Sequence, residues 1–205
     1  RQKMILRKER LFLSKNINIK SKIFLDSGNP IETKEILVLL GYLDGQPSRV
    51  ELAGQTTNPS LVAKNLIGRK MLEVELLDFY KKIIGDISAL VPNGSVSIEV
   101  YADEKTTVQE MLSQGEMMYK WIANAHIKFP ITTEGLKAAE MAVKKGMRVN
   151  MTLCFSQEQA AAVYSATRGA QRGDVLVSPF IGRLDDRGEN GMDLIKNIIE
   201  MYKGG

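Results

Sequence analysis

Cysteine and histidine are almost absent from this sequence, with Cys154 and His126 as the single examples. One cysteine excludes an intramolecular disulfide framework and is typical of a reducing compartment, so we expect a cytoplasmic protein. One histidine cannot supply the imidazole pairs or triads on which zinc sites are commonly built. The sequence therefore predicts neither a disulfide-stabilised scaffold nor a histidine-based metal site.

Long apolar runs and a strong charge of one sign are also missing. No run approaches the roughly 20 apolar residues that a membrane-spanning helix needs. The formal net charge is only +4, and the excess of basic residues lies within residues 1–10. The remainder is close to neutral, which argues against a nucleic-acid platform. We expect neither a membrane nor a nucleic acid as partner.

What the chain does have is enough length and apolar content to bury a sizeable core. Its 205 residues are 44% hydrophobic, which fits one main domain. Residues 1–21 are basic and show no clear hydrophobic period, so we interpret them as an N-terminal extension. The domain itself is expected over residues 22–205.

From residue 22 onward, a short apolar strand followed by an amphipathic helix repeats six times. The strands are expected at 22–28, 50–53, 95–101, 126–130, 149–155 and 175–177. The helices are expected at 30–43, 60–90 with an interruption near Gly68, 106–123, 132–145, 156–170 and 192–202, with a loop over 178–188. Consecutive βα units imply right-handed crossovers and a parallel sheet.

Polar residues gather where these strands end, and they favour a barrel over an open sheet. In a parallel barrel all such ends meet at one mouth, where these folds do their chemistry. A nucleotide-binding sheet would carry glycines in its first turn, yet 26–29 is not G-x-G-x-x-G and no P-loop is present. We predict a (β/α)8-barrel fold with about six units in this chain. The last two units are then missing, so we expect a fragment with exposed sheet edges and a possible homo-oligomer.

Lys128 is the most informative of these residues. Strand alternation places its side chain opposite Ile127 and Phe129, beside that of His126. Inside a barrel the amine loses water, which favours the neutral form that attacks carbonyl carbons. The alternative is a lysine at a strand edge that deters aggregation. We expect His126 to be packed and hydrogen-bonded rather than catalytic, and Cys154 to be a small core residue.

Six separated segments, in order, resemble the transaldolase family within the class I aldolases. They are Phe24-Leu25-Asp26, Thr56-Thr57-Asn58-Pro59-Ser60-Leu61, Ser97-Ile98-Glu99-Val100, Ile127-Lys128-Phe129-Pro130, Val149-Asn150-Met151-Thr152-Leu153 and residues 178–186. Each segment alone is weak, but together they are specific. The resemblance implies sugar phosphate substrates and no cofactor, since an iminium acts as the electron sink that a metal would otherwise provide.

The resemblance also assigns roles to residues. It implies that Lys128 forms the Schiff base, that Asp26 is the acid/base for the carbon–carbon bond, and that Glu99 transfers protons. With these two carboxylates, Thr152 is expected to hold a catalytic water. The residues implied in substrate binding are Asn58, Thr57, Asn150, Ser178, Phe180 and Arg183, with Arg183 nearest the phosphate.

Several of these residues have ordinary structural explanations. Asp26 could cap the helix that starts at Pro30, Asn58 could be a turn residue, and Thr152 is a good strand former. Glu99 is more telling, because an unpaired carboxylate between two apolar residues is costly to bury.

Two positions distinguish branches of the family. Glu99 and Phe180 resemble transaldolases proper, whereas the fructose 6-phosphate aldolase branch typically has Gln and Tyr there. The sequence therefore predicts transfer of a dihydroxyacetone unit to an aldose phosphate, as in the pentose phosphate pathway. The alternatives are aldol cleavage without an acceptor, and a catalytically inactive truncated homologue.

Overall fold

The computed structural model describes residues 22–40, 52–64 and 73–203, in which six strands form one parallel sheet. The strands follow one another in chain order, from first to last, as the βα rhythm predicts. They are β1 (Ile23–Asp26), β2 (Leu52–Thr56), β3 (Ser95–Glu99), β4 (Ala125–Pro130), β5 (Val149–Cys154) and β6 (Val175–Pro179). The expected extension over 1–21 and the expected helix interruption near Gly68 lie outside the described residues.

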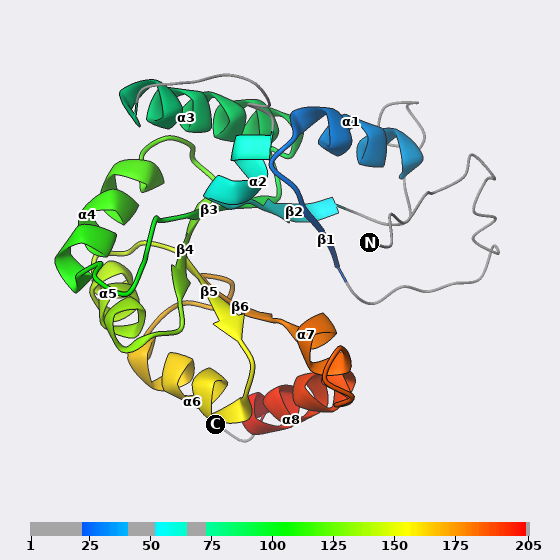
Figure 1. Ribbon diagram of the computed structural model, residues 1–205, viewed down its shortest axis with the longest axis vertical. Helices are drawn as coiled ribbons and strands as arrows, with labels where there is room; N and C mark the ends of the chain where they lie inside the picture. Colours follow the sequence, from blue (N-terminus) through cyan, green and yellow to red (C-terminus); the bar gives the residue numbers. More distant parts are fainter. Residues whose placement is uncertain (1–21, 41–51, 65–72, 204–205) are drawn as a thin grey trace.

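Helices connect the strands and cover the outer side of the curled sheet. They are α1 (Pro30–Leu39), α2 (Pro59–Ala63), α3 (Glu73–Leu90), α4 (Val108–Tyr119), α5 (Thr133–Lys144), α6 (Gln157–Ala166), α7 (Ile181–Asp185) and α8 (Gly191–Lys203). In Figure 1 they form an arc that runs from α1 past α4 and α5 to α8 and stays open between α1 and α7. The fold is thus a curled, partial α/β barrel, as predicted. None of the helices in the described ranges is long and apolar enough to cross a membrane.

Several expected boundaries were wrong; α4, for example, runs over Val108–Tyr119 rather than 106–123. Strand β2 runs on from Leu52 to Thr56, because Gly54 and Gln55 pair with β3 although neither is a strong strand former. Helix α6 ends at Ala166 rather than near Ala170, since the chain turns through a positive φ at Gly169. Part of the loop expected over 178–188 is the short helix α7.

Alternation along the central strands separates an apolar outer face from a polar inner face. On β4, Ile127 and Phe129 are fully buried in the main core. A Cβ added to Gly115 of α4 would come within 3.0 Å of Phe129, which shows how closely helix and strand pack. Lys128 therefore points to the inner side, where the strands also bury Ser97 and Asn150. The strands therefore place these three polar side chains inside the curl.

The turn between β4 and α5 is fixed by a cap and by a glycine. Thr132 caps α5 by accepting a hydrogen bond from the backbone N–H of Gly135 at 3.0 Å. A Cβ at Gly135 would lie only 2.0 Å from the carbonyl oxygen of Pro130, so this position has no room for a side chain. The cap and the close packing of Gly135 on Pro130 therefore fix the backbone conformation just after Lys128.

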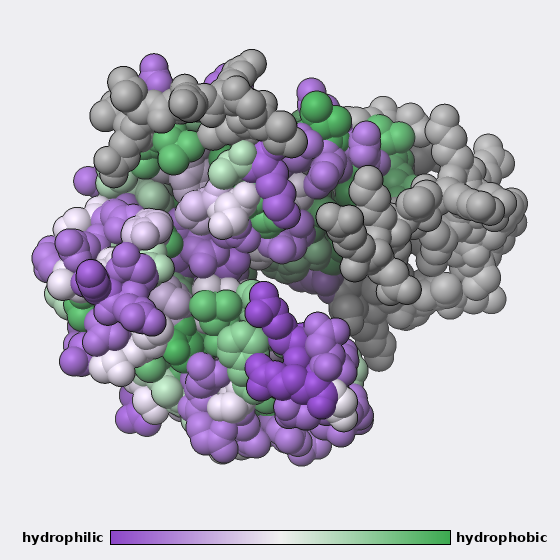
Figure 2. All heavy atoms as spheres, viewed as in Figure 1, coloured by the Kyte–Doolittle hydropathy of each residue, from purple (hydrophilic) through white to green (hydrophobic). Residues whose placement is uncertain are grey.

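A hollow lies on the open side of the curl. Figure 2 shows it between the upper and lower arms of the molecule, with hydrophobic atoms along part of its lower border. Of the described strands, β1 and β6 each pair with one neighbour only.

Candidate active site

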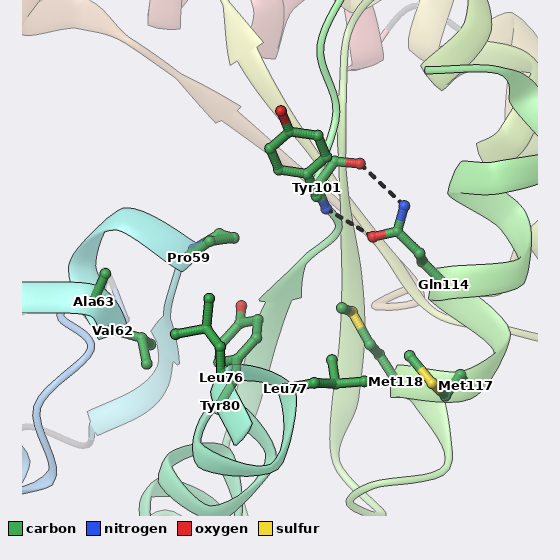
Figure 3. A pocket seen from close by; sticks show the side chains of 10 residues that line it. All are labelled: Pro59, Val62, Ala63, Leu76, Leu77, Tyr80, Tyr101, Gln114, Met117 and Met118. Atoms are coloured by element: carbon green, nitrogen blue, oxygen red, sulfur yellow. Dashed lines mark hydrogen bonds between the residues drawn. The ribbon is translucent and has the colours of Figure 1, made fainter. Parts of the chain in front are cut away.

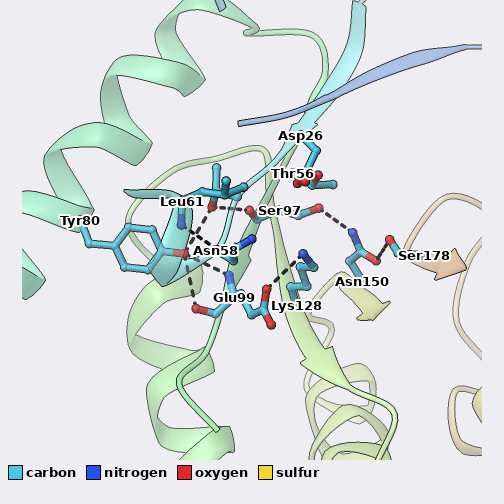
Figure 4. Close-up of polar contacts among 11 residues, drawn as sticks. Asp26, Thr56, Asn58, Leu61, Tyr80, Ser97, Glu99, Lys128, Asn150 and Ser178 are labelled. Carbon is cyan, nitrogen blue, oxygen red and sulfur yellow. Dashed lines mark hydrogen bonds and ion pairs between the residues drawn. The ribbon is translucent and has the colours of Figure 1, made fainter. Parts of the chain in front are cut away.

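An ion pair between the buried Lys128 and Glu99 lies at the centre of the inner face. The two residues are direct neighbours in the pairing of β3 with β4, and Nζ of Lys128 lies 3.1 Å from Oε2 of Glu99. Lys128 is 4% exposed. Figure 4 shows both side chains turned toward the same space inside the curl. A lysine that is this enclosed and paired is not an edge lysine that deters aggregation.

The carboxyl group of Glu99 is held in an unusual electrostatic environment. Burial raises the pKa of Glu99 above its ordinary value of 4.5, and the ammonium of Lys128 opposes this shift without cancelling it. The negative charge of Asp26 adds to the increase. A carboxylate of raised pKa beside an amine is well suited to take a proton from it and return it.

Asp26 ends β1 at the same edge of the sheet. Its carboxylate accepts a hydrogen bond of 2.6 Å from the hydroxyl of Thr56, its neighbour in the pairing with β2. The side chain is exposed. Helix α1 is capped by Asn29 instead, which accepts from the N–H of Ile31. Asp26 is therefore not a helix cap, and its carboxylate lies at the mouth of the curl.

Asn150 connects three strands on the inner face. Its amide donates to the hydroxyl of Ser97 at 2.9 Å, and its carbonyl accepts from the hydroxyl of Ser178 at 2.8 Å (Figure 4). Asn150 also pairs directly with Lys128 in the register of β4 and β5. The amide thus joins β3, β5 and β6 beside the lysine.

Thr152 lies two residues further along β5 and carries a buried hydroxyl without a partner. The residue is 1% exposed, and no described group hydrogen-bonds its Oγ1. The next residue, Leu153, has a φ of 62°, which is rare for a leucine. It lies where the pairing with β6 shifts between Met151 and Cys154. An unpaired buried hydroxyl next to a strained backbone is typical of a functional site.

Thr57 and Asn58 follow β2, and their contacts differ. Asn58 is the N-cap of α2, since its Oδ1 accepts from the N–H of Leu61 at 2.8 Å. Thr57 is fully buried, and its hydroxyl donates to the carbonyl of Ser97 and lies 3.3 Å from the hydroxyl of Tyr80. Thr57 therefore bonds β3 on the side of the outer helices, through Ser97 and Tyr80. Asn58 is half-buried at the strand ends.

Phe180 and Arg183 follow β6 and lie outside this hydrogen-bond network. The ring of Phe180 packs on that of Phe155, with centroids 5.6 Å apart. Arg183 lies on α7 with an exposed side chain, and no ion pair joins it to another described residue. Both residues follow the C-terminal end of β6, so they lie at the end of the sheet where the other strands also end. Arg183 is not brought into contact with Lys128.

His126 lies on the inner face of β4 and is hydrogen-bonded, as expected. Its Nε2–H donates to the carbonyl of Gly173 at 3.0 Å, so its Nδ1 accepts from the hydroxyl of Ser95 at 2.8 Å. Burial, together with the charge of Arg148, lowers its pKa below 6.5. This is a neutral, structural histidine at the start of the strand that carries the lysine.

Three residues at the site were not singled out from the sequence. Ser97 shares the inner face of β3 with Glu99 by simple alternation, so the pattern contained that signal. Thr56 ends β2 and Asp26 ends β1, and the two residues are neighbours in the pairing of these strands. Tyr80 is different, because it comes from an outer helix and nothing in its sequence context indicates a contact with Glu99.

A separate apolar pocket opens on the outer layer, between α2, α3 and α4. It encloses about 590 Å³ and is lined mainly by Val62, Leu76, Leu77, Tyr80, Met117 and Met118 (Figure 3). Lys128 and Asp26 do not line it. The pocket therefore does not coincide with the polar inner face.

The fold and the inner face together define an α/β protein of the parallel-barrel class with a lysine–carboxylate pair at its strand ends. The chain belongs to the transaldolase/fructose-6-phosphate aldolase family, whose sequence profile matches residues 23–204. This match takes in nearly all of the described residues.

Individual relatives agree with the family. A "Probable transaldolase" of Dehalococcoides mccartyi is 42% identical over 182 residues, which are 89% of this chain and 71% of that protein. A "Probable transaldolase" of Bacillus cereus is 41% identical over 88% of this chain and 70% of its own length. A solved structure described as a "putative dehydratase from Mesorhizobium loti" has a TM-score of 0.53 at 10% identity. It covers 89% of this chain and 45% of its own chain, and it supports the fold alone.

Proposed function

We propose that this chain is a transaldolase, which transfers a dihydroxyacetone unit from a ketose phosphate to an aldose phosphate. The donors are sedoheptulose 7-phosphate or fructose 6-phosphate, in the pentose phosphate pathway of the cytoplasm. The observation that carries the proposal is the buried Lys128 beside Glu99, with Asp26 at the same strand ends. Family membership and relatives named as probable transaldolases support it.

The reaction begins with Lys128. Its neutral Nζ attacks the ketone carbon of the donor and forms a carbinolamine, which loses water to give an iminium. This step needs a proton removed from nitrogen and a proton delivered to the departing hydroxyl. Glu99 supplies both transfers, because its carboxyl lies 3.1 Å from Nζ and its pKa is raised.

Carbon–carbon cleavage follows from the iminium. Asp26 takes the proton of the hydroxyl group two carbons from the iminium carbon, and the electron pair of the broken bond moves into the iminium to form an enamine. The aldehyde leaves, and an acceptor aldose phosphate takes its place. The enamine attacks the acceptor aldehyde, Asp26 returns the proton, and water releases the new ketose phosphate from Lys128.

Hydrogen-bonding side chains around the lysine are proposed to hold the sugar. The amide of Asn58 and the Asn150–Ser178 pair face the hydroxyl groups of the three-carbon unit, with Thr57 supporting the strand behind them. Thr152 offers its unpaired buried hydroxyl to the water used in hydrolysis. Arg183 binds the phosphate, because a guanidinium can hold two phosphate oxygens at once.

Reductive trapping tests this proposal directly. The chain is incubated with fructose 6-phosphate and borohydride, and the adduct is located by intact mass and peptide mapping. A reduced three-carbon or six-carbon adduct on Lys128 is expected, and none on the Lys128→Met variant. The surface lysine of the Lys144–Glu140 pair gives the matched control, since Lys144→Met should trap as much as the unaltered chain.

The same experiment needs a second protein, because the relatives are longer than the matched region. A version that is extended with the C-terminal part of the D. mccartyi relative would be trapped in parallel. An adduct on the extended version alone would mean that the 205-residue chain lacks part of its site. No adduct on either protein would overturn the proposal and favour an inactive homologue.

Phe180 is the reason to propose transfer rather than simple cleavage. A tyrosine hydroxyl at this position could deliver a proton to the enamine and release free dihydroxyacetone, which a phenyl ring cannot do. Phe180→Tyr should therefore raise the ratio of cleavage to transfer. An unchanged ratio would contradict this role of Phe180.

A further inference from the structure

Tyr80 is a buried tyrosine whose hydroxyl group reaches the backbone of Glu99. It lies on α3 in the outer helix layer and is 6% exposed. Its ring meets that of Trp121 edge to face, with centroids 5.7 Å apart and planes at 82°. Its hydroxyl accepts a hydrogen bond from the N–H of Glu99 at 3.2 Å and lies 3.4 Å from the carbonyl oxygen of Glu99 (Figure 4).

The hydroxyl takes the place of a missing strand neighbour. In a strand, the N–H and C=O of one residue point to the same side, and those of the next residue point to the other. The N–H of Val100 bonds the carbonyl of Lys128 on β4, so the backbone groups of Glu99 face β2. Strand β2 ends at Thr56, where the chain turns away into α2. The sheet therefore offers no partner to the N–H and the carbonyl of Glu99, and the hydroxyl of Tyr80 takes that place.

The third contact of the hydroxyl is with Thr57. The Thr57 hydroxyl donates to the carbonyl of Ser97 at 2.8 Å, so it can only accept from Tyr80, at 3.3 Å. The single Tyr80 proton is therefore shared between Thr57 and the Glu99 carbonyl. Burial raises the pKa of Tyr80 well above 10.0, so the hydroxyl keeps this proton at neutral pH.

A similar device holds the chain two residues further on. The side chain of Gln114 on α4 accepts from the N–H of Tyr101 and donates to its carbonyl oxygen, at 3.0 Å and 3.2 Å. Both outer helices thus hold the segment that leaves β3 (Figure 3). Of these two side chains, Tyr80 is the one that bonds to Glu99, the residue that pairs with Lys128.

We infer that Tyr80 is a positioning residue for the Schiff-base step, because its hydroxyl fixes the backbone of Glu99 and so holds the Glu99 carboxyl on Lys128. The inference deepens the proposed function and rests on it. Small displacements of a catalytic group cost large factors in rate. Loss of the hydroxyl should therefore slow iminium formation without removing any atom that touches the substrate.

The test uses Tyr80→Phe, which keeps the ring and its packing on Trp121. The rate of adduct formation on Lys128 is measured over a range of pH with cyanoborohydride. We expect a fall on the order of tenfold or more. We also expect the acidic limb of the pH profile to move to higher pH, because a looser Glu99 loses the ammonium that lowers its pKa.

The matched control is Tyr202→Phe, which removes another tyrosine hydroxyl that donates to a backbone carbonyl, that of Ala160 at 2.8 Å. It lies on α8, and its hydroxyl bonds to α6 rather than to the segment that leaves β3. This variant should keep the pH profile of the unaltered chain. If Tyr80→Phe changes only stability and leaves the rate and pH profile of the folded protein as they were, Tyr80 is merely structural and the inference is wrong.

Amide hydrogen exchange in the unaltered chain tests the same contact without any substitution. The N–H of Glu99 should exchange about as slowly as that of Val100, whose partner is a strand carbonyl. Fast exchange at Glu99 alone would overturn the inference. If the unaltered chain and its extended version both form no adduct on Lys128, the proposed function fails first, and slow exchange at Glu99 would then report a structural bond only.

Discussion

Lys128 and Glu99 are direct neighbours across β3 and β4, and their charged groups meet 3.1 Å apart on the inner face of the sheet. Register places these residues together, because parallel pairing brings residues of the same level side by side. Neither side chain depends on a flexible loop for its position. The pair is therefore built into the sheet itself, and its chemistry depends on how firmly the ends of β3 and β4 are held.

Removing the charge of Glu99 should change how stability depends on pH. Its raised pKa means that the folded chain binds more protons than the unfolded chain above pH 4.5, so the free energy of unfolding falls as pH rises through that range. In Glu99→Gln this contribution to the slope should disappear. Urea unfolding at a series of pH values measures it. Glu140→Gln, at a surface carboxylate, is the control, and the same slope in Glu99→Gln as in the unaltered chain would contradict the raised pKa.

His126 should give the opposite dependence. Because its pKa is lowered from 6.5, the unfolded chain binds the proton first, and the folded chain loses stability as pH falls below 6.5 toward the folded-state value. His126→Gln, which cannot titrate, should show a flatter curve over this range. Urea unfolding of both proteins tests the expectation. A free energy of unfolding that rises on acidification through this range, relative to the variant, would have the wrong sign.

Asn150→Ala should destabilise the fold as well as affect the site. The change removes one buried and one partly buried hydrogen bond and leaves the hydroxyls of Ser97 and Ser178 without their partner. We expect a loss of about 1–3 kcal/mol in the free energy of unfolding. Ser178→Ala removes only one of the bonds and should cost about 1 kcal/mol. Equal losses in the two variants would argue against the bridging role of Asn150.

Two glycine-to-alanine changes in helices should act in opposite directions. Gly135→Ala places a methyl group 2.0 Å from the carbonyl oxygen of Pro130 and should destabilise the chain by about 1–3 kcal/mol. Gly85→Ala, in α3, meets no other group within 4 Å and should stabilise it by about 0.5–1 kcal/mol, since alanine is the better helix former. Thermal unfolding compares the two. No loss of stability in Gly135→Ala would mean that the β4–α5 turn can move to make room for a methyl group.

The order of strands and the inward position of Lys128 were predictable from the sequence. Both follow from local rules, namely the βα rhythm and the alternation along His126–Pro130. The main core followed for the same reason, because Ile127 and Phe129 fill the other face of the strand. The polar residues expected together at the strand ends included Asp26, Glu99 and Asn150, and the structure places all three on the same face as Lys128.

What could not be predicted depends on contacts between distant segments. Tyr80 lies on a helix where periodicity indicates burial but says nothing of where its hydroxyl ends. The positive φ of Leu153 has no sequence signal, since leucine rarely adopts it and tertiary structure must impose it. The continuation of β2 through Gly54 and Gln55 arose likewise, because sheet pairing outweighed weak strand propensity.

The end of β2 has a consequence for how this fold can vary. A side chain from α3 completes the backbone pairing of Glu99, so the sheet does not need β2 to continue past Thr56. The N–H of Thr57 still donates to the carbonyl of Ser97, and only the described connection after Thr57 leaves the hydrogen-bond ladder. Insertions or substitutions after Asn58 can reshape the strand ends where the proposed function places the substrate, while the lysine keeps its counterion. Under the proposed function, acceptor preference could then evolve separately from the carbon–nitrogen chemistry.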